Sequence, residues 1–387
     1  MDQTVAMDLV KKGSTLLLLD VPQGTLVGLD TQVFITGPIF KGIKMIPPGP
    51  HFIYYCSSNR EGKEFSPIFG FFVTTSYSEV IVRKWSNQEE RLVKFSEEEE
   101  LRYSAAVKHL EFDKQLGPYP LEHFKKWKNF SNYITENTIE RLEPIGGEIS
   151  VAYESCPIKT NHQETMEINA EQLKNNKLST PVGESKKPGC CYTYIPRFIK
   201  RKDTTQEELT TLNLDKTSLL EIILKNNFGD SDDLLLGELQ FSFIAFLMGQ
   251  SLEAFYQWKA LVSLLFSCTH APLHTRTRMF TKFIRVLYFQ LRHACSSDGK
   301  ASVGGSEKGI SFFLDDCWFS KDIFLYRLCK EFIFLIEEAT AIDGDLLSRT
   351  KKLKKLLETS FGWDFQYSLA DMIDEDDEFS PVVVSVD

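Results

Sequence analysis

Two histidines spaced four residues apart, His270 and His274, are the clearest candidates for metal chemistry in this 387-residue chain. On a helix this spacing places both imidazole rings on one face, as in zinc enzymes with the pattern H-E-x-x-H. The glutamate that acts as general base in those enzymes is absent here, and Pro272 disrupts a helix between the histidines. The side chains close enough in sequence to complete a zinc site are Cys268, His293 and Cys295. We expect a surface histidine pair and no metal site.

Other candidates for catalysis have simpler explanations. Asp232-Asp233 and Asp315-Asp316 are paired carboxylates, but both pairs stand at expected helix starts, where capping accounts for them. Cys190-Cys191 is the only adjacent cysteine pair and is expected to be inert. The glycine-rich stretch 304–309 follows no strand and lacks the G-K-[ST] of a phosphate-binding loop, so it is expected to be a flexible loop. We therefore expect no catalytic residue, no cofactor and no enzymatic activity, although an enzyme with a site between two domains is an alternative.

A short basic stretch raises the question of RNA binding. Arg197, Lys200, Arg201 and Lys202 follow the aromatic run 192–196, in which Tyr192 and Tyr194 could stack on bases. The net charge of −10 argues against binding by broad phosphate neutralisation, and four basic residues are also typical of a solvated linker. Direct RNA binding is not the expected function, but an RNA-binding adaptor that uses this linker stays open as an alternative.

The C-terminal tail is the segment most typical of a protein-binding site. Residues 371–387 contain seven acidic side chains and no Lys or Arg, and they end in a β-branched run that has nothing local to pair with. Such a run can add a strand to the sheet edge of a partner, while the acids steer a basic partner. Folding back onto the chain's own β domain is the alternative. The expected partner-binding residues are Pro381, Val382, Val383, Val384, Ser385 and Val386, and Ser380 before Pro381 is a candidate phosphorylation site.

The secondary structure expected to position these residues changes along the chain, from strands at the N-terminal end to helices at the C-terminal end. Up to about residue 95, runs rich in Val, Ile, Phe, Tyr and Thr alternate with Pro-Gly turns, which predicts strands. After Asp203 the apolar residues follow a helical period. We predict an α+β fold: an antiparallel β-sandwich-like domain with flanking helices, followed by an all-α helical bundle of about six helices. The predicted parts are 1–153, a polar linker 154–204, the helical domain 205–368 and the tail 369–387.

Individual boundaries follow from local signals. The expected strands are Thr15–Val21, Val33–Thr36, His51–Tyr55, Ser66–Thr74 and Glu79–Ser86. Ser96 and Glu99 form a capping-box pattern that starts a helix ending near residue 113. The run 234–248 is apolar almost all round, which predicts a buried helix capped by Ser231. Further helices are expected at Leu252–Ser267, Thr275–Cys295, Trp318–Ala339 (capped by Asp316) and Asp345–Phe361 (ended by Gly362).

Targeting signals are not visible in the sequence. The first residues lack a basic region followed by an apolar one, and no run of eighteen apolar residues exists. Without a secretory signal the eight cysteines are expected to be reduced thiols. We therefore expect a cytoplasmic and nuclear protein that has no membrane partner.

Three blocks of sequence together resemble the AAR-two splicing factor family. They are LLLLDVPQGTLVGLD with FKGIKMIPPGPHFIYY within 16–55, the helical run 235–266, and 351–365 with its acidic, valine-ended tail. The resemblance implies an assembly factor of the U5 small nuclear ribonucleoprotein that binds the RNase H-like and Jab1/MPN-like domains of the large core protein, Prp-eight. It implies that this binding blocks premature helicase and RNA binding, and that other U5 proteins are partners. In that family the tail adds a strand between the two partner domains, a role that falls on Pro381–Val386 here. Phosphorylation regulates release in that family, but no serine of this chain is matched to that role.

Overall fold

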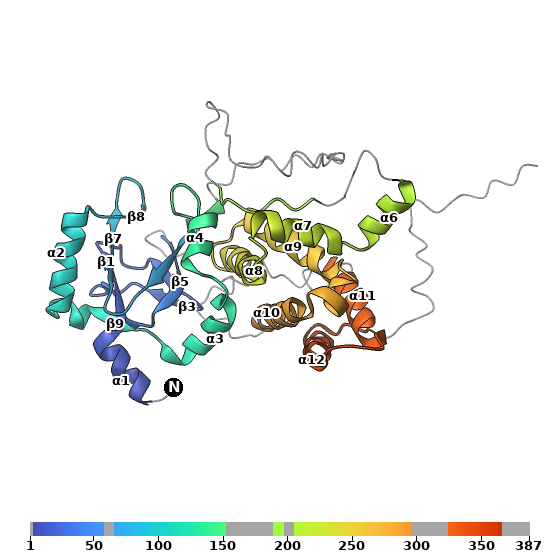
Figure 1. Cartoon of the computed structure of the whole chain (residues 1–387). Coiled ribbons are helices and arrows are strands. Elements are labelled where there is room, and N and C mark those ends of the chain that lie inside the picture. The colour runs from blue at the N-terminus through green and yellow to red at the C-terminus, as the bar shows by residue number, and fades with distance from the viewer. Residues whose placement is uncertain (1–2, 58–65, 152–188, 197–204, 296–323, 366–387) are drawn as a thin grey trace, which may run out of the picture.

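The computed structural model describes residues 3–57, 66–151, 189–196, 205–295 and 324–365. Figure 1 shows two β-sheets at the N-terminal side and a group of helices beside them, joined by α3 and α4. The predicted α+β class, with a β domain followed by a helical domain, is confirmed. The division into 1–153, 154–204, 205–368 and 369–387 stays a prediction, because most of the linker and the whole acidic tail lie outside the described residues.

The β domain consists of two sheets. The first has the order β8-β7-β1-β4-β9 and the second the order β3-β2-β5-β6. The strands of the first sheet are β1 (Ser14–Leu19), β4 (Gly42–Ile46), β7 (Val80–Ser86), β8 (Arg91–Val93) and β9 (Leu116–Pro118). Those of the second sheet are β2 (Leu26–Leu29), β3 (Gln32–Ile35), β5 (Gly49–Cys56) and β6 (Phe69–Thr75).

Strand direction differs between the two sheets. Every pairing in the second sheet is antiparallel, as predicted. In the first sheet β1 pairs with β7, and β4 with β9, in parallel, so this sheet is mixed. The difference has a topological cause: neither parallel pair is consecutive along the chain, since β2 to β6 lie between β1 and β7, and β5 to β8 lie between β4 and β9. A long crossover of this kind permits parallel pairing, whereas a hairpin does not.

Strand β5 belongs to two hydrophobic cores at once. Successive side chains of a strand point to opposite faces of its sheet. Ile53 and Tyr55 accordingly pack toward the first sheet, whereas Phe52 and Tyr54 lie in a core that continues into the helical domain. At that junction the ring of Phe72 stacks on Phe241, with centroids 4.3 Å apart. The second sheet is therefore buried on both faces, and the two domains share one core.

Four helices flank the β domain: α1 (Gln3–Lys12), α2 (Glu97–Lys108), α3 (Leu121–Ser131) and α4 (Glu136–Leu142). The predicted capping box is present at α2, where Ser96 and Glu99 bond reciprocally to each other's backbone N–H groups. Helix α1 corrects the expectation of strands alone before residue 95. Its Leu9 is buried, and Lys11 and Lys12 at its end suit the negative pole of the helix dipole.

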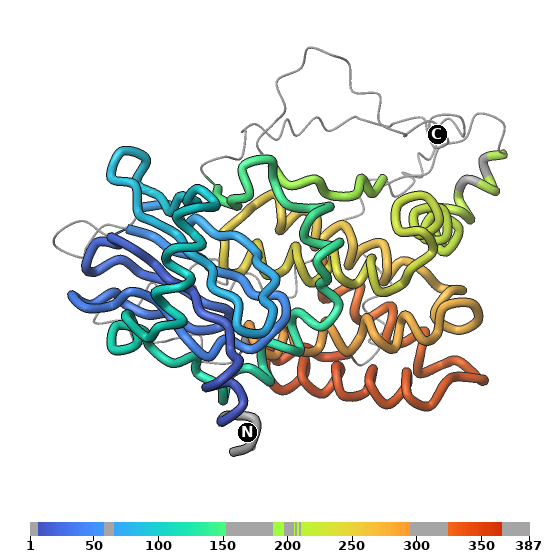
Figure 2. The backbone as a smooth tube through the Cα atoms, turned by 60° about the vertical axis from the view of Figure 1, so that its left-hand side comes forward, coloured from blue at the N-terminus to red at the C-terminus, as the bar shows by residue number. Residues whose placement is uncertain are grey.

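The described part of the helical domain contains seven α-helices, against about six predicted. They are α6 (Gln206–Leu214), α7 (Thr217–Asn227), α8 (Asp232–Leu247), α9 (Leu252–Phe266), α10 (Thr277–Cys295), α11 (Phe324–Glu338) and α12 (Gly344–Phe361). Figure 2 shows α12, in red, running below α10 and away from the sheets. The predicted cap at Ser231 is present, and Gly362 ends α12 with φ of 64°. Asp316 and residues 318–323 lie outside the described part of the chain.

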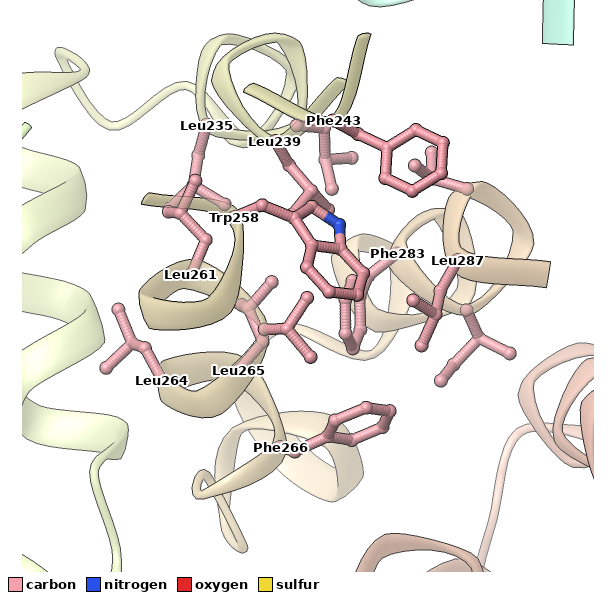
Figure 3. Packing of buried hydrophobic residues seen from close by; sticks show 14 of the residues in the cluster. Leu235, Leu239, Phe243, Trp258, Leu261, Leu264, Leu265, Phe266, Phe283 and Leu287 are labelled. Carbon is pink, nitrogen blue, oxygen red and sulfur yellow. The ribbon is translucent and has the colours of Figure 1, made fainter. Parts of the chain in front are cut away.

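Trp258 of α9 lies at the centre of the helical core (Figure 3). Its indole packs among Leu239 and Phe243 of α8 and Leu287 of α10. The indole Nε1 donates a hydrogen bond to Oε1 of Gln290, 3.0 Å away, so the one polar atom of this ring is satisfied. The predicted buried helix is confirmed, since every residue from Leu235 to Leu247 in α8 is buried.

Gly237 lets α8 approach the β domain closely. A Cβ added at this position would lie 2.6 Å from the carbonyl oxygen of Tyr133. Because that oxygen belongs to the backbone, Gly237→Ala is expected to separate the two elements and to lower the free energy of unfolding by about 1–3 kcal/mol. Urea denaturation measures this loss. Gly146→Ala is the matched control, since nothing lies within 4 Å of its added Cβ, and an equal loss in both variants would contradict the close-approach argument.

Candidate functional sites

The candidate zinc ligands do not come together. His270 and His274 are both exposed: His270 precedes the π-helical turn Ala271–Thr275, His274 lies in it, and their ring centroids are 4.5 Å apart. Cys268 is buried, and burial raises the pKa of its thiol. His293 stands sixteen residues beyond the start of α10, which is about 24 Å along the helix axis. Among the described side chains no group of three or more His, Cys, Asp or Glu is placed to hold a metal ion.

The Asp232-Asp233 pair lies in the first turn of α8, as predicted. Asp232 accepts a hydrogen bond from Arg276 at 3.2 Å, and Asp233 accepts one from Lys282 at 2.6 Å. Arg276 also contacts Glu221 and Asp230, so these groups tie the starts of α8 and α10 to α7. The pair supports the fold at this point. Asp315-Asp316 lies outside the described residues.

The segment 189–196 contains Tyr192 and Tyr194, the two tyrosines considered for stacking on RNA, and their surroundings differ. The ring of Tyr192 packs edge-on against Phe241, with centroids 6.2 Å apart, and is covered by the core. Tyr194 points outward and is 67% exposed. Of the cysteine pair, Cys191 is exposed and Cys190 is partly covered. Because Tyr192 is packed against the core, at most one of the two tyrosines is available for stacking. The basic residues Arg197–Lys202 lie outside the described residues.

A buried carboxylate, Glu238 of α8, holds this segment in place. Its side chain is fully buried and accepts hydrogen bonds from the backbone N–H and the hydroxyl of Thr193, both at 2.8 Å. Arg141 of α4 donates to Glu238 at 2.7 Å, and Gln257 of α9 donates at 2.8 Å. The guanidinium of Arg141 also lies 4.7 Å from the centre of the Phe228 ring. One carboxylate thus joins α4, α8, α9 and the segment 189–196.

The energetics of this cluster depend on complete pairing. A buried carboxylate is costly unless opposite charge and hydrogen bonds compensate for the lost water. Glu238 meets this condition with four donors on its two oxygens. Gln257 also donates to the Thr193 carbonyl at 2.9 Å, so both backbone polar groups of Thr193 are satisfied. The cluster therefore fixes the position of the segment 189–196 against α4, α8 and α9.

A second buried polar cluster lies beneath the Pro47-Pro48-Gly49 turn. Nδ1 of His51 is 2.7 Å from Oδ2 of Asp30, and its Nε2 is 2.7 Å from the Pro47 carbonyl oxygen. Tyr119 donates to the same Asp30 oxygen at 2.6 Å, and the Phe52 N–H donates to the other oxygen at 3.1 Å. The unusual turn therefore supplies a carbonyl that fixes the histidine ring.

These contacts determine the protonation of His51. The Pro47 carbonyl can only accept, so Nε2 carries a proton. Nδ1 faces Oδ2 of Asp30 at 2.7 Å, and a second proton on this nitrogen makes an imidazolium–carboxylate pair. Burial alone would lower the pKa of His51, but the Asp30 charge and the hydrogen bonds to Asp30 and Pro47 raise it above 6.5. Burial and Asp30 likewise raise the pKa of Tyr119.

A His–Asp pair is also the arrangement that orients a general base in many enzymes. Here both side chains are only 1% exposed, and both ring nitrogens are already bonded to protein oxygens. No ring nitrogen faces solvent or a substrate. The pair therefore stabilises the junction of the hairpin β2–β3, the strand β5 and the start of α3 rather than serving catalysis.

Sequence reasoning missed both clusters. One signal was present for Glu238, because a single acid inside the apolar run 234–248 has to be buried and paired. Its partners Arg141 and Thr193 are 97 and 45 residues away, and no local pattern indicates them. The predicted binding residues Pro381, Val382, Val383, Val384, Ser385 and Val386, and the candidate phosphorylation site Ser380, lie outside the described residues.

The described chain is thus a two-part α+β protein in which a two-sheet domain and a helical domain share a core, braced by two buried polar clusters. Comparison with known families finds the AAR2 N-terminal domain at residues 12–144 and the AAR2 C-terminal repeat region at residues 192–366. Full-length relatives agree: the chain is 31% identical over 398 residues to the Protein AAR2 homolog of Homo sapiens, with 100% of this chain and 97% of that protein covered. The chain belongs to the AAR2 family.

More distant relatives extend the same comparison. The Protein AAR2 homolog of Caenorhabditis elegans is 30% identical over 372 residues, covering 92% of this chain and 95% of that protein. The A1 cistron-splicing factor AAR2 of Saccharomyces cerevisiae is 20% identical over 284 residues, covering 72% of this chain and 77% of that protein. None of the described helices combines the length and low charge needed to cross a bilayer.

Proposed function

We propose that this protein acts in pre-mRNA splicing as an assembly chaperone of the U5 small nuclear ribonucleoprotein. It binds the RNase H-like and Jab1/MPN-like domains of the large U5 core protein and blocks premature helicase and RNA binding, and it works in the cytoplasm and the nucleus without enzymatic activity. The observation that carries this proposal is the match over the whole chain to a family whose yeast member is named a splicing factor. The identity of the partner rests on the family resemblance.

The described structure supports a binding role through the rigidity of its two-domain body. Because the second sheet is covered on both faces, a partner that contacts both domains meets them in a fixed arrangement. Fixed surfaces lose less conformational entropy on binding than surfaces that must be ordered first. The tail starts from an equally fixed point, since Phe365 is stacked on Tyr326 with ring centroids 5.8 Å apart.

The valine run offers a direct test of strand addition. Val383→Pro removes a backbone N–H and cannot continue a strand ladder, so we expect recovery of the large core protein with the tagged full-length chain to fall about tenfold. Val383→Thr is the matched control, because it keeps the N–H and a β-branched side chain. The measurement is affinity purification from a splicing-competent extract, with the partner quantified by mass spectrometry.

The two variants separate the possible outcomes. Loss with proline and retention with threonine supports pairing through the backbone. Equal recovery of the core protein with Val383→Pro and with the unaltered chain would contradict the assignment of Pro381–Val386 as the binding strand. If the unaltered chain itself recovers no core protein in a stoichiometric amount, the proposed partner is wrong.

A further inference from the structure

Charge is strongly segregated in this protein. Helix α10 has four basic residues (Lys or Arg) and no acidic residue (Asp or Glu). Helix α12 has five basic and two acidic residues, and α3 has three basic residues and one acidic residue. The three helices together carry a net charge of +9, in a chain whose total is −10. Helix α10 packs against both α12 and α3, and Figure 1 shows all three on the lower side of the molecule. Positive charge therefore gathers on one side of an acidic protein.

The charges on α10 and α12 stand on the outward sides of these helices. Arg278 and Arg285 are exposed and seven residues apart, which places them on one stripe of α10. Lys351, Lys352 and Lys355 are exposed on α12. We call these five residues the basic face. None of the five has an acidic partner within ion-pair distance among the described residues.

Neighbouring basic residues do have such partners. Lys282 of α10 pairs with Asp233 at 2.6 Å, Lys354 of α12 pairs with Glu337 at 2.9 Å, and Arg349 pairs with Asp345 at 3.1 Å. The helices therefore use some of their cations to hold the fold together and leave the basic face available to a negatively charged ligand. Repulsion among these five cations is relieved when such a ligand binds.

We propose that the basic face binds the acidic segment 371–378 of the same chain. This segment holds six of the seven acids of the C-terminal tail, at Asp371 and from Asp374 to Glu378. Its charge complements the face, and it is joined to the helix that carries most of the face. The role of this contact rests on the proposed function: it holds the binding strand 381–386 on the chain until the partner binds that strand.

The length of the connection fits this contact. The described chain ends at Phe365, which is held beside α11 by its stacking on Tyr326, and the Tyr326 hydroxyl donates to the Asp364 carbonyl at 2.6 Å. Five residues lie between Phe365 and Asp371, and this connection reaches up to about 20 Å when extended. The segment 371–378 spans up to about 25 Å, close to the length of about 27 Å expected for the 18 residues of α12.

A tethered ligand is favoured over a free one on this face. A short flexible tether gives a segment an effective concentration of about a millimolar at its own binding site. RNA or another polyanion would have to displace the segment, and the overall charge of −10 repels RNA at long range. A second copy of the chain would have to supply its tail at the much lower concentration of free protein.

Carbodiimide coupling of the full-length chain tests the contact without any partner. The reagent joins carboxylates to amines that already touch, so peptide mass spectrometry should find residues 371–378 linked to Lys351, Lys352 or Lys355. The yield should not change on tenfold dilution, and it should fall at about 1 M NaCl, where the Debye length is about 3 Å. No such links, or a yield that falls in proportion to dilution, would overturn the proposal.

Two matched variants give an independent readout. Changing the six acids of 371–378 to their amides should raise the acylation rate of the three lysines by about threefold, while exposed Lys108 and Lys225 keep their rates. Replacing Lys351, Lys352 and Lys355 by glutamine should abolish the coupling product and leave the circular dichroism spectrum unchanged. If the amide variant leaves lysine reactivity unchanged and only added single-stranded RNA lowers it, the face is an RNA site and the proposal fails.

Discussion

Glu238→Ala is expected to lower the free energy of unfolding by about 3–5 kcal/mol, because it leaves a partly buried arginine without its counter-charge. The side chain of Glu238 is fully buried, and that of Arg141 is 27% exposed. Removal of the carboxylate also leaves the Thr193 N–H without its acceptor and takes away one of the two acceptors of the Gln257 amide. The loss is larger than a typical surface substitution, which changes stability by about 0.5 kcal/mol or less.

The measurement is urea denaturation of the full-length chain followed by tryptophan fluorescence. Glu358→Ala on the exposed side of α12 is the matched control and should lie within about 0.5 kcal/mol of the unaltered chain. A local readout distinguishes a clamp from general destabilisation: the bonds around 189–196 should be cut faster by protease, under native conditions, in Glu238→Ala. A loss below about 1 kcal/mol with unchanged cleavage would mean that the cluster does not hold the segment.

Asp30→Ala should cost a similar amount, about 3–5 kcal/mol, because it strips the His51 imidazolium of its buried counter-charge. Tyr119→Phe removes only one of the donors to Asp30 and should cost about 1 kcal/mol. The ratio of the two losses tests whether charge pairing, rather than a single hydrogen bond, is the main contribution. Equal losses in both variants would show that it is not.

The same pair predicts how stability depends on pH. The pKa of His51 is raised in the folded state above its unfolded value of 6.5, so folding favours the protonated form. Its contribution is therefore fully present below pH 6.5 and is lost as pH rises through the folded-state pKa. The stability difference between the unaltered chain and His51→Gln should therefore shrink as the pH rises above 6.5 and through the folded-state pKa of His51. Exposed His109→Gln should show no such trend, and a difference that grows with pH would contradict the ion pair.

Features that depend on contacts between residues close in sequence were predicted, whereas features that depend on distant contacts were missed. The caps at Ser96, Ser231 and Gly362 were predicted because a cap bonds within three or four residues of itself. Strands β2 and β4 were missed, because Leu26–Leu29 and Gly42–Ile46 are short and carry glycines that look like turn residues. Gly28 is there for packing: the ring of Tyr54 lies where its Cβ would be.

The sequence by itself determined the α+β class, the main helices and their caps, the family and the chemistry of the tail. Periodicity, caps and motif blocks are local properties, so they can be read before the chain is folded. Only the tertiary structure decided that Arg141 meets Glu238, that Asp30 meets His51, and that three cationic helices lie side by side. The two polar contacts join residues 97 and 21 positions apart, and they exist because β5 and α8 bury their faces in common cores.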